Sequence, residues 1–205
     1  MRTTLNLIRE KEPCKSGWEK LLRHLGKTRP DDEPLALAEI LRSNGLDDAI
    51  WCLVAVDGAD RDARLFAVWC ARQVQHLMAG KRSIAALDVT ERFENGVATE
   101  KERDAASAAA WDAAMEKDNA TALAAARGEY MGAALVSAWV VALASARGAA
   151  SAAAWASAWA SAKHSARDSA LVASRGSALI SDRGAQLDMF LAMCEGKAPW
   201  QNKEK

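Results

Sequence analysis

The residues best able to do chemistry form a charged row in the first half of the chain. Arg64, Arg72 and His76 fall at intervals of four, with Val68 in the remaining position, so they share one flank of a helix. Four carboxylates precede or begin this stretch: Asp47, Asp48, Asp57 and Asp60. An unpaired buried charge is costly, so a charged row on a mostly apolar helix must face water or be paired. We therefore expect Asp–Arg pairs that join this helix to the one before it.

The same residues also allow an enzymatic interpretation. His76 could act as a general base if Asp47 or Asp48 oriented its ring. The sequence offers no nucleophile or oxyanion site at a recognisable spacing, no glycine-rich phosphate loop and no carboxylates paired at metal spacing. Structural ion pairs are therefore the favoured interpretation, and we expect no catalytic residue, no metal and no cofactor.

Two further groups of residues would suit a protein partner. Trp155 and Trp159 lie one helical turn apart, and Trp139 belongs to the same alanine-rich region. Exposed tryptophans among small residues would form a binding hot spot, although such rings can also fill grooves between helices, where we expect most of the eight tryptophans. The second group is an acidic run: Asp31, Asp32 and Glu33. An acidic patch there would complement a basic partner.

The elements that carry these residues are predicted to be helices, and no convincing strand pattern appears. Helices are expected at about 17–25, 34–44, 48–56, 61–78 and 84–94. Their expected N-terminal caps are Ser16, Asp47, Asp60 and Ser83, with Pro34 in the first turn of the second helix and Thr99 opening a further helix. The helix at 61–78 is apolar over most of its circumference, so it should be central and largely buried.

The second half of the chain is dominated by alanine. From residue 105 to residue 178 roughly two residues in five are alanine, several times the ordinary usage. Turns are expected near 118–119, 128, 147–148 and 168. The sequence thus predicts an all-α bundle of roughly nine helices, with an N-terminal helical region (1–98), an alanine-rich bundle with tryptophan (99–198) and a frayed tail (199–205), all within one continuous fold.

Composition narrows the classes of function. The 205 residues carry a net charge of zero and no basic stripe, which argues against nucleic-acid binding. The charge-free stretches 130–146 and 148–162 fall short of the roughly 20 apolar residues that a membrane span needs, so we expect no membrane association. The four cysteines are far apart in sequence, and no secretion signal is evident at the N-terminus. A cytoplasmic protein of a bacterial host cell, with reduced thiols, is expected.

Several segments resemble known proteins. GLDDAIWCL at 45–53 and RLFAVWCARQVQHL at 64–77 are similar to phage and prophage proteins. RSIAALDV at 82–89, ERF at 91–93 and GVAT at 96–99, followed by alanine-rich helices and QLDMFL at 186–191, resemble the helical immunity-protein family found near bacterial polymorphic toxins. The resemblance covers about residues 46–193 and transfers no catalytic residue. It implies a stoichiometric protein binder.

We therefore expect a helical protein that binds and blocks another protein, either as an immunity factor against a toxin or as a phage factor against a host defence protein. Two alternatives stay open. One is a small helical enzyme that uses His76 with Asp47 or Asp48. The other is a self-associating scaffold, a homodimer for example, whose alanine-rich helices pair between chains.

Overall fold

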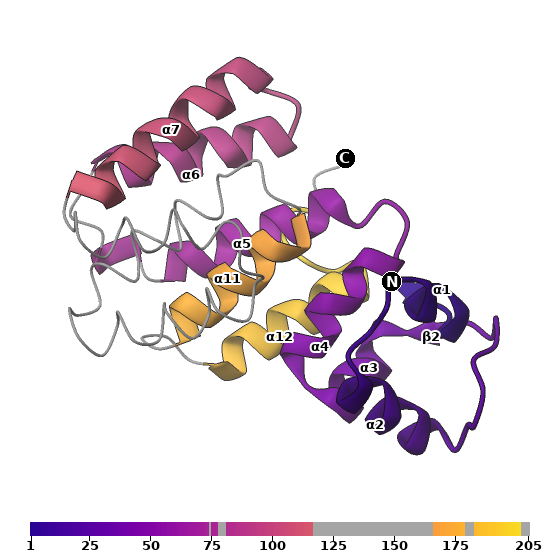
Figure 1. Ribbon diagram of the computed structural model, residues 1–205. Helices are drawn as coiled ribbons and strands as arrows, with labels where there is room; N and C mark the ends of the chain where they lie inside the picture. The colour runs from indigo at the N-terminus through magenta and orange to yellow at the C-terminus, as the bar shows by residue number, and fades with distance from the viewer. Residues whose placement is uncertain (74, 78–80, 117–165, 179–182, 202–205) are drawn as a thin grey trace.

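The computed structural model describes residues 1–73, 75–77, 81–116, 166–178 and 183–201, and these are mostly helical (Figure 1). The α-helices are α1 (Leu5–Glu10), α2 (Lys15–Leu25), α3 (Leu37–Asn44), α4 (Leu46–Trp51), α5 (Asp60–Gln73), α6 (Lys81–Glu94), α7 (Glu100–Glu116), α11 (Ala166–Ala178) and α12 (Arg183–Cys194). Two short 3-10 helices, η1 (Cys52–Ala55) and η2 (Gln75–Leu77), follow α4 and α5. The all-α prediction is confirmed. No helix of the described residues is both long and apolar enough to cross a membrane.

One small sheet interrupts the helical pattern. Strands β1 (Arg2–Thr3) and β2 (Leu35–Ala36) pair antiparallel. Buried Thr3 fixes the strand pair in place, because its hydroxyl donates a hydrogen bond of 2.5 Å to the carbonyl of Ala55. The prediction that Pro34 opens a helix is wrong, since α3 begins at Leu37, after the strand. Two-residue strands are too short for an alternating pattern to appear in the sequence.

The core is centred on α5, with α11 packed along it (Figure 1). Phe66 on α5 is fully buried and meets Phe190 of α12 edge to face, with 5.6 Å between the ring centroids. Both helices also bury alanines completely: Ala67 and Ala71 on α5, and Ala170 and Ala173 on α11. Small side chains let two helix axes approach closely. The first half of the chain and the last helices therefore share one core.

Helices α6 and α7 form an antiparallel pair at one end of the molecule (Figure 1). The turn between them passes through Gly96, whose φ of +73° suits glycine. The expected capping box is confirmed: the Thr99 hydroxyl accepts from the Glu102 amide at 3.2 Å, and the Glu102 carboxylate accepts from the Thr99 amide at 2.7 Å. Between the paired helices Ala86 and Ala110 are completely buried.

Several expected helix starts are shifted. Helix α2 is capped by the Cys14 thiol, which accepts from the Gly17 amide, and Ser16 lies inside the helix. Helix α4 begins at Leu46 directly after Gly45, so Asp47 belongs to its first turn and does not cap it. Ser83 is buried inside α6. A helix can begin at any of several neighbouring residues, and tertiary packing decides which of them becomes the first.

One further expectation fails, and one is tested only in part, near the C-terminus. The turn expected at residue 168 is absent, since Asp168 lies in the first turn of α11. Of the tail expected at 199–205, the structure describes residues 199–201, which pack against α5. Trp200 is buried, its indole Nε1 donates to Asp62 Oδ1 at 2.9 Å, and the Gln201 amide donates to the other oxygen at 2.8 Å. A buried indole with its N–H satisfied stabilises this segment.

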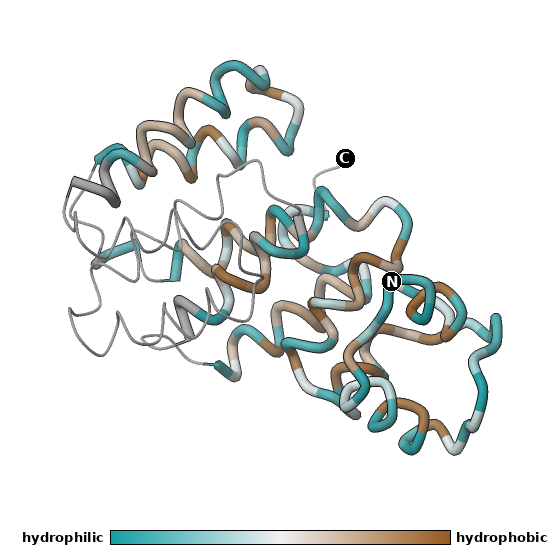
Figure 2. The backbone as a smooth tube through the Cα atoms, viewed as in Figure 1, coloured by the Kyte–Doolittle hydropathy of each residue, from teal (hydrophilic) through white to brown (hydrophobic). Residues whose placement is uncertain are grey.

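The hydropathy of the backbone follows this packing. Figure 2 shows the loop between α2 and β2 as mainly hydrophilic, whereas hydrophobic residues alternate with polar ones along the helices. That loop contains the acidic run, and Asp32 and Glu33 are exposed in it.

The central position of Phe66 predicts a large effect of its removal. Phe66→Ala should lower the free energy of unfolding by about 3–5 kcal/mol, because it leaves a cavity under α11 and α12. Val97→Ala, at a side chain that is 67% exposed, is the control and should change it by less than about 0.5 kcal/mol. Urea denaturation followed by circular dichroism measures both, and equal midpoints for the two variants would contradict this core.

Candidate functional site

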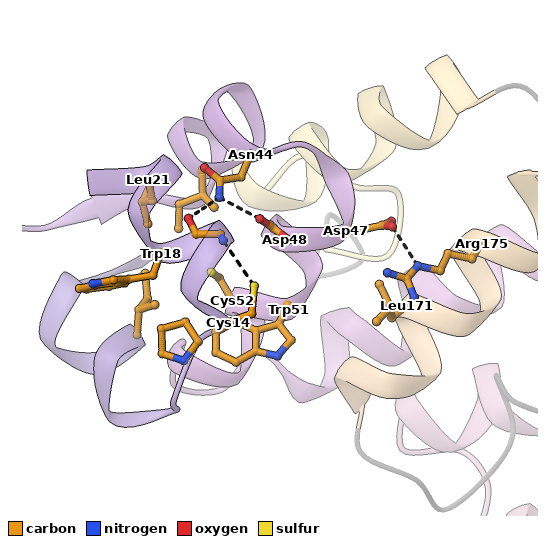
Figure 3. Close-up of a pocket in the computed structure, with 14 residues that line it drawn as sticks. Cys14, Trp18, Leu21, Asn44, Asp47, Asp48, Trp51, Cys52, Leu171 and Arg175 are labelled. Carbon is orange, nitrogen blue, oxygen red and sulfur yellow. Dashed lines mark hydrogen bonds and ion pairs between the residues drawn. The ribbon is translucent and has the colours of Figure 1, made fainter. Parts of the chain in front are cut away.

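A half-open pocket of about 130 Å³ lies where α2, α3, α4 and α11 meet (Figure 3). Most of its wall is apolar and comes from Ile8, Pro13, Trp18, Leu21, Ile40, Trp51 and Leu171. Its polar atoms come from Cys14, Asn44, Asp47, Asp48 and Arg175. An engineered protein cavity of about 150 Å³ binds benzene, so this pocket can receive one small ligand or one side chain.

Helices α2 and α4 approach closely at Gly17, on one wall of the pocket. A Cβ atom at this position would lie 2.9 Å from Asp48 Oδ2 and 3.1 Å from Cys14 Sγ. The Gly17 carbonyl accepts a hydrogen bond of 2.8 Å from the Asn44 side chain, and its amide donates to the Cys14 sulfur at 3.4 Å. The absence of a side chain at Gly17 therefore leaves room for the Cys14 thiol and the Asp48 carboxylate beside α2.

Asp48 contributes a carboxylate to this wall. Its Oδ2 accepts a hydrogen bond of 2.8 Å from the Asn44 amide, which at the same time bonds the Gly17 carbonyl. Ser43 in turn donates to Asn44 Oδ1 at 2.7 Å and fixes the orientation of that amide. Asp48 forms no salt bridge with any of the residues that the structure describes.

Asp47, the neighbouring carboxylate, is held by two arginines. Arg175 Nε of α11 lies 2.9 Å from Asp47 Oδ2, and Arg183 of α12 lies 2.6 Å from Asp47 Oδ1. Arg183 also donates to Gln186, a fully buried residue of α12. The first turn of α4 is thus tied to both C-terminal helices, and the Asp47–Arg175 pair forms one end of the pocket (Figure 3).

Two thiols belong to the pocket, and their environments differ. Cys52 is buried, and burial raises the pKa of its thiol to about 12, with a smaller contribution from the negative charge of Asp48. Cys14 is exposed at the start of α2. The other two thiols, Cys70 and Cys194, are buried elsewhere, and burial also raises the pKa of Cys194 to about 12.

The carboxylates that pair with the two arginines of α5 lie on α6. Arg64 pairs with Glu94 at 3.4 Å. Arg72 pairs with Asp88 at 2.6 Å and Glu91 at 3.2 Å. The prediction of Asp–Arg pairs between the α4 segment and α5 is therefore wrong, because α6 folds back along α5 and supplies nearer carboxylates.

The remaining members of the expected polar cluster are dispersed. Asp57 and Asp60 are exposed, in the turn before α5 and at its first residue, and His76 is exposed in η2. In the described part of the chain, the hydrogen bonds and ion pairs of Asp47 and Asp48 go to Asn44 and the arginines, and neither carboxylate contacts His76. The structure does not bring the enzymatic set together.

The expected partner-binding residues are only partly placed. Trp139, Trp155 and Trp159 lie outside the described residues. In the acidic run, Lys27 Nζ lies 2.7 Å from Asp31 and 2.5 Å from Glu33. The hydrogen bond from Lys27 lowers the pKa of Asp31, and the two carboxylates raise the pKa of Lys27. Asp32 is exposed beside this trio, so the run is less acidic than its sequence indicates.

Sequence reasoning missed the pocket itself. Its lining comes from segments as far apart as Ile8 and Arg175, and no local pattern marks such a convergence. One signal was present: Gly17 lies inside an amphipathic helix, where a glycine indicates a close approach by another group. Nothing in the local sequence distinguishes Arg175 from the other arginines.

A second polar group lies between α5, α6 and α7, around Glu94. The side chain of Glu94 is 9% exposed, and its Oε1 accepts no hydrogen bond from the described residues. Burial raises the pKa of this carboxyl, and the charges of Arg64, Arg103 and Arg61 oppose the shift only in part. Asp60 adds a small shift in the same direction as burial.

The four thiols should differ in reactivity, because alkylating reagents attack accessible thiolates. In the native protein we expect one thiol to react quickly with iodoacetamide and the Cys14→Ser variant to lose that reaction, since the other three cysteines are buried. Urea should expose all four. Mass spectrometry of the alkylated peptides measures this, and rapid native labelling of Cys52 would contradict the structure.

Glu94 should make stability depend on pH. The pKa of its carboxyl is higher in the folded than in the unfolded chain, so the native state binds an extra proton between the two values. As the pH falls from 7.5 to 5, wild type should therefore gain stability relative to Glu94→Gln. Urea midpoints measure the difference, with Glu10→Gln at an exposed position of α1 as the control for the loss of a charge. If the difference in urea midpoint between wild type and Glu94→Gln stayed constant over this pH range, the raised pKa of Glu94 would be contradicted.

Comparison with known proteins adds no further information on the site. No family model, curated protein or solved structure matches this chain.

Proposed function

We propose that this chain is a stoichiometric protein-binding inhibitor, of the immunity or phage anti-defence type, and that it is not an enzyme. The pocket between α2, α4 and α11 carries the proposal. It is half-open, mostly apolar and sized for a single side chain. Protein interfaces concentrate their binding energy in a few side chains that fill such pockets.

The pocket is preformed by the core around it. Trp18, Leu21 and Ile40 are buried members of the hydrophobic core, so the floor of the pocket belongs to that core. The ion pairs of Asp47 with Arg175 and Arg183 fix α11 and α12 against α4. A site that needs no ordering on binding loses less affinity to conformational entropy. This is the property expected of an inhibitor that binds one target tightly.

The enzymatic alternative receives no support from the geometry. For Asp47 to orient His76, its bonds to two arginines would have to break, and Asp48 would have to leave Asn44. The pocket thiol Cys14 caps a helix and has no histidine beside it in the pocket lining. A catalytic cysteine normally needs an adjacent base or a positive environment.

The proposal predicts a specific complex. The tagged full chain should recover one protein, a toxin or host defence component, from a lysate of its source cell. Native mass spectrometry should give one copy of each. Trp51→Ala removes an aromatic wall of the pocket and should weaken the complex at least about 30-fold, as expected for a hot spot worth about 2 kcal/mol. Gly17→Ala, which places a methyl group against Asp48, should also weaken it.

Val97→Ala, on the exposed turn between α6 and α7, is the matched control and should bind like wild type. Circular dichroism establishes that each variant is folded. The activity of the recovered protein, measured with and without the chain, tests inhibition. Recovery of the chain as a homodimer alone would favour the scaffold alternative, and a partner bound equally well by the pocket variants would place the interface elsewhere.

A further inference from the structure

We infer that the pocket receives a lysine side chain of the protein partner, with its ammonium group on Asp48. This inference rests on the proposed function and names the chemistry of its anchor. The charge of Asp48 is the first reason. Its carboxylate lies in a mostly apolar wall, yet its one hydrogen bond among the described residues comes from the neutral amide of Asn44. A carboxylate in such surroundings is stabilised by a cation.

Among the described residues, the cations near Asp48 have other partners. Arg175 and Arg183 are both bonded to Asp47. Lys20 reaches the backbone carbonyl of Asn44 at 3.4 Å and makes no salt bridge with Asp48. Within the described part of the chain, Asp47 is therefore paired with two arginines, whereas Asp48 forms no ion pair. An incoming cation would complement the second.

The aromatic wall favours the same kind of ligand. Cations are attracted to the face of an indole ring, and Trp18 and Trp51 both line the pocket. Arg9 already lies over Trp18, 5.7 Å from the ring centroid. No cation of the described residues lies over Trp51, so this ring can contact the ammonium or the stem of an entering side chain. Figure 3 shows Trp51 on the side of the pocket that also holds Cys14.

The hydrogen bond that Asp48 already accepts favours lysine over arginine as the ligand. Asp48 Oδ2 already accepts from Asn44, so one oxygen stays open to a ligand. A guanidinium group binds best when its fork meets both oxygens, whereas an ammonium group acts as a point charge. Lysine also carries a flexible apolar stem, which can pack along Leu171 and Ile40 while the charged end reaches the carboxylate.

Small probes can test this without the partner, using Cys14 as a reporter at the pocket edge. The full chain is alkylated with iodoacetamide in the presence of n-butylammonium chloride, which reproduces the lysine side chain, or of n-butanol, its neutral counterpart. Ionic strength is matched with sodium chloride. n-Butylammonium should slow the alkylation of Cys14 at least threefold near 20 mM, consistent with millimolar binding of a fragment of five heavy atoms. n-Butanol should not.

Two variants make the result specific to Asp48. Asp48→Asn keeps an oxygen that can accept from Asn44 but removes the charge, and it should abolish the protection by n-butylammonium. Asp188→Asn makes the same chemical change on the exposed side of α12 and should leave the protection intact. Equal protection by the amine and the alcohol, or protection that survives Asp48→Asn, would overturn the inference.

These outcomes are separate from those of the partner experiment. Suppose that a partner is captured and that Trp51→Ala weakens its binding, but that Asp48→Asn binds it as tightly as wild type. The inference of a lysine on Asp48 is then wrong, and the proposed function stands. If n-butylammonium binds at Asp48 while no partner is recovered, the amine site is supported and the proposed function fails. If methylguanidinium protects Cys14 better than n-butylammonium, arginine replaces lysine and the inference is overturned.

Discussion

The close approach of α11 to α5 is the constraint on which the rest of the structure depends. Alanines that are completely buried on both helices, Ala67 and Ala71 on one and Ala170 and Ala173 on the other, allow it. The same helix α11 then presents Leu171 and Arg175 to α4, where they close one side of the pocket. Without this contact Asp47 would lose one arginine, and the pocket would be an open surface of α2 and α4.

Asp47 and Asp48 show how adjacent residues can serve different purposes. Asp47 has a structural role, because its carboxylate forms ion pairs with two arginines from α11 and α12. Asp48 is held by one neutral amide and keeps one oxygen open at the pocket. A charge left incompletely paired in an apolar site lowers the stability of the unbound protein. Such local costs are common where a surface is shaped for binding.

The sequence predicts local features of this fold well and distant ones poorly. The helices around Leu21, Ile40 and Phe66 follow from apolar periodicity, and the Thr99 capping box from the spacing of two residues. These depend on neighbours within one or two turns. The partners of Arg64 and Arg72 depend on how α6 folds back along α5. From the sequence alone, any nearby carboxylate could form an ion pair with these arginines. The register of helix caps has the same ambiguity, as Cys14 in place of Ser16 shows.

The lysine preference inferred for the pocket could not be predicted from the sequence, because it depends on contacts that are absent as well as on contacts that are present. Gly17 leaves out a Cβ atom that would press on Asp48 Oδ2, and this absence lets the carboxylate stay beside the helix. Asn44 takes that same oxygen and so withholds the second contact that an arginine fork would use. Specificity is the difference between the affinities for two ligands. A site can therefore become specific by losing a contact that only the competing ligand uses, even when its affinity for the favoured ligand does not change. A sequence motif consists of residues that are present, whereas the inferred discrimination depends on an oxygen already bonded to Asn44 and on the side chain that Gly17 lacks.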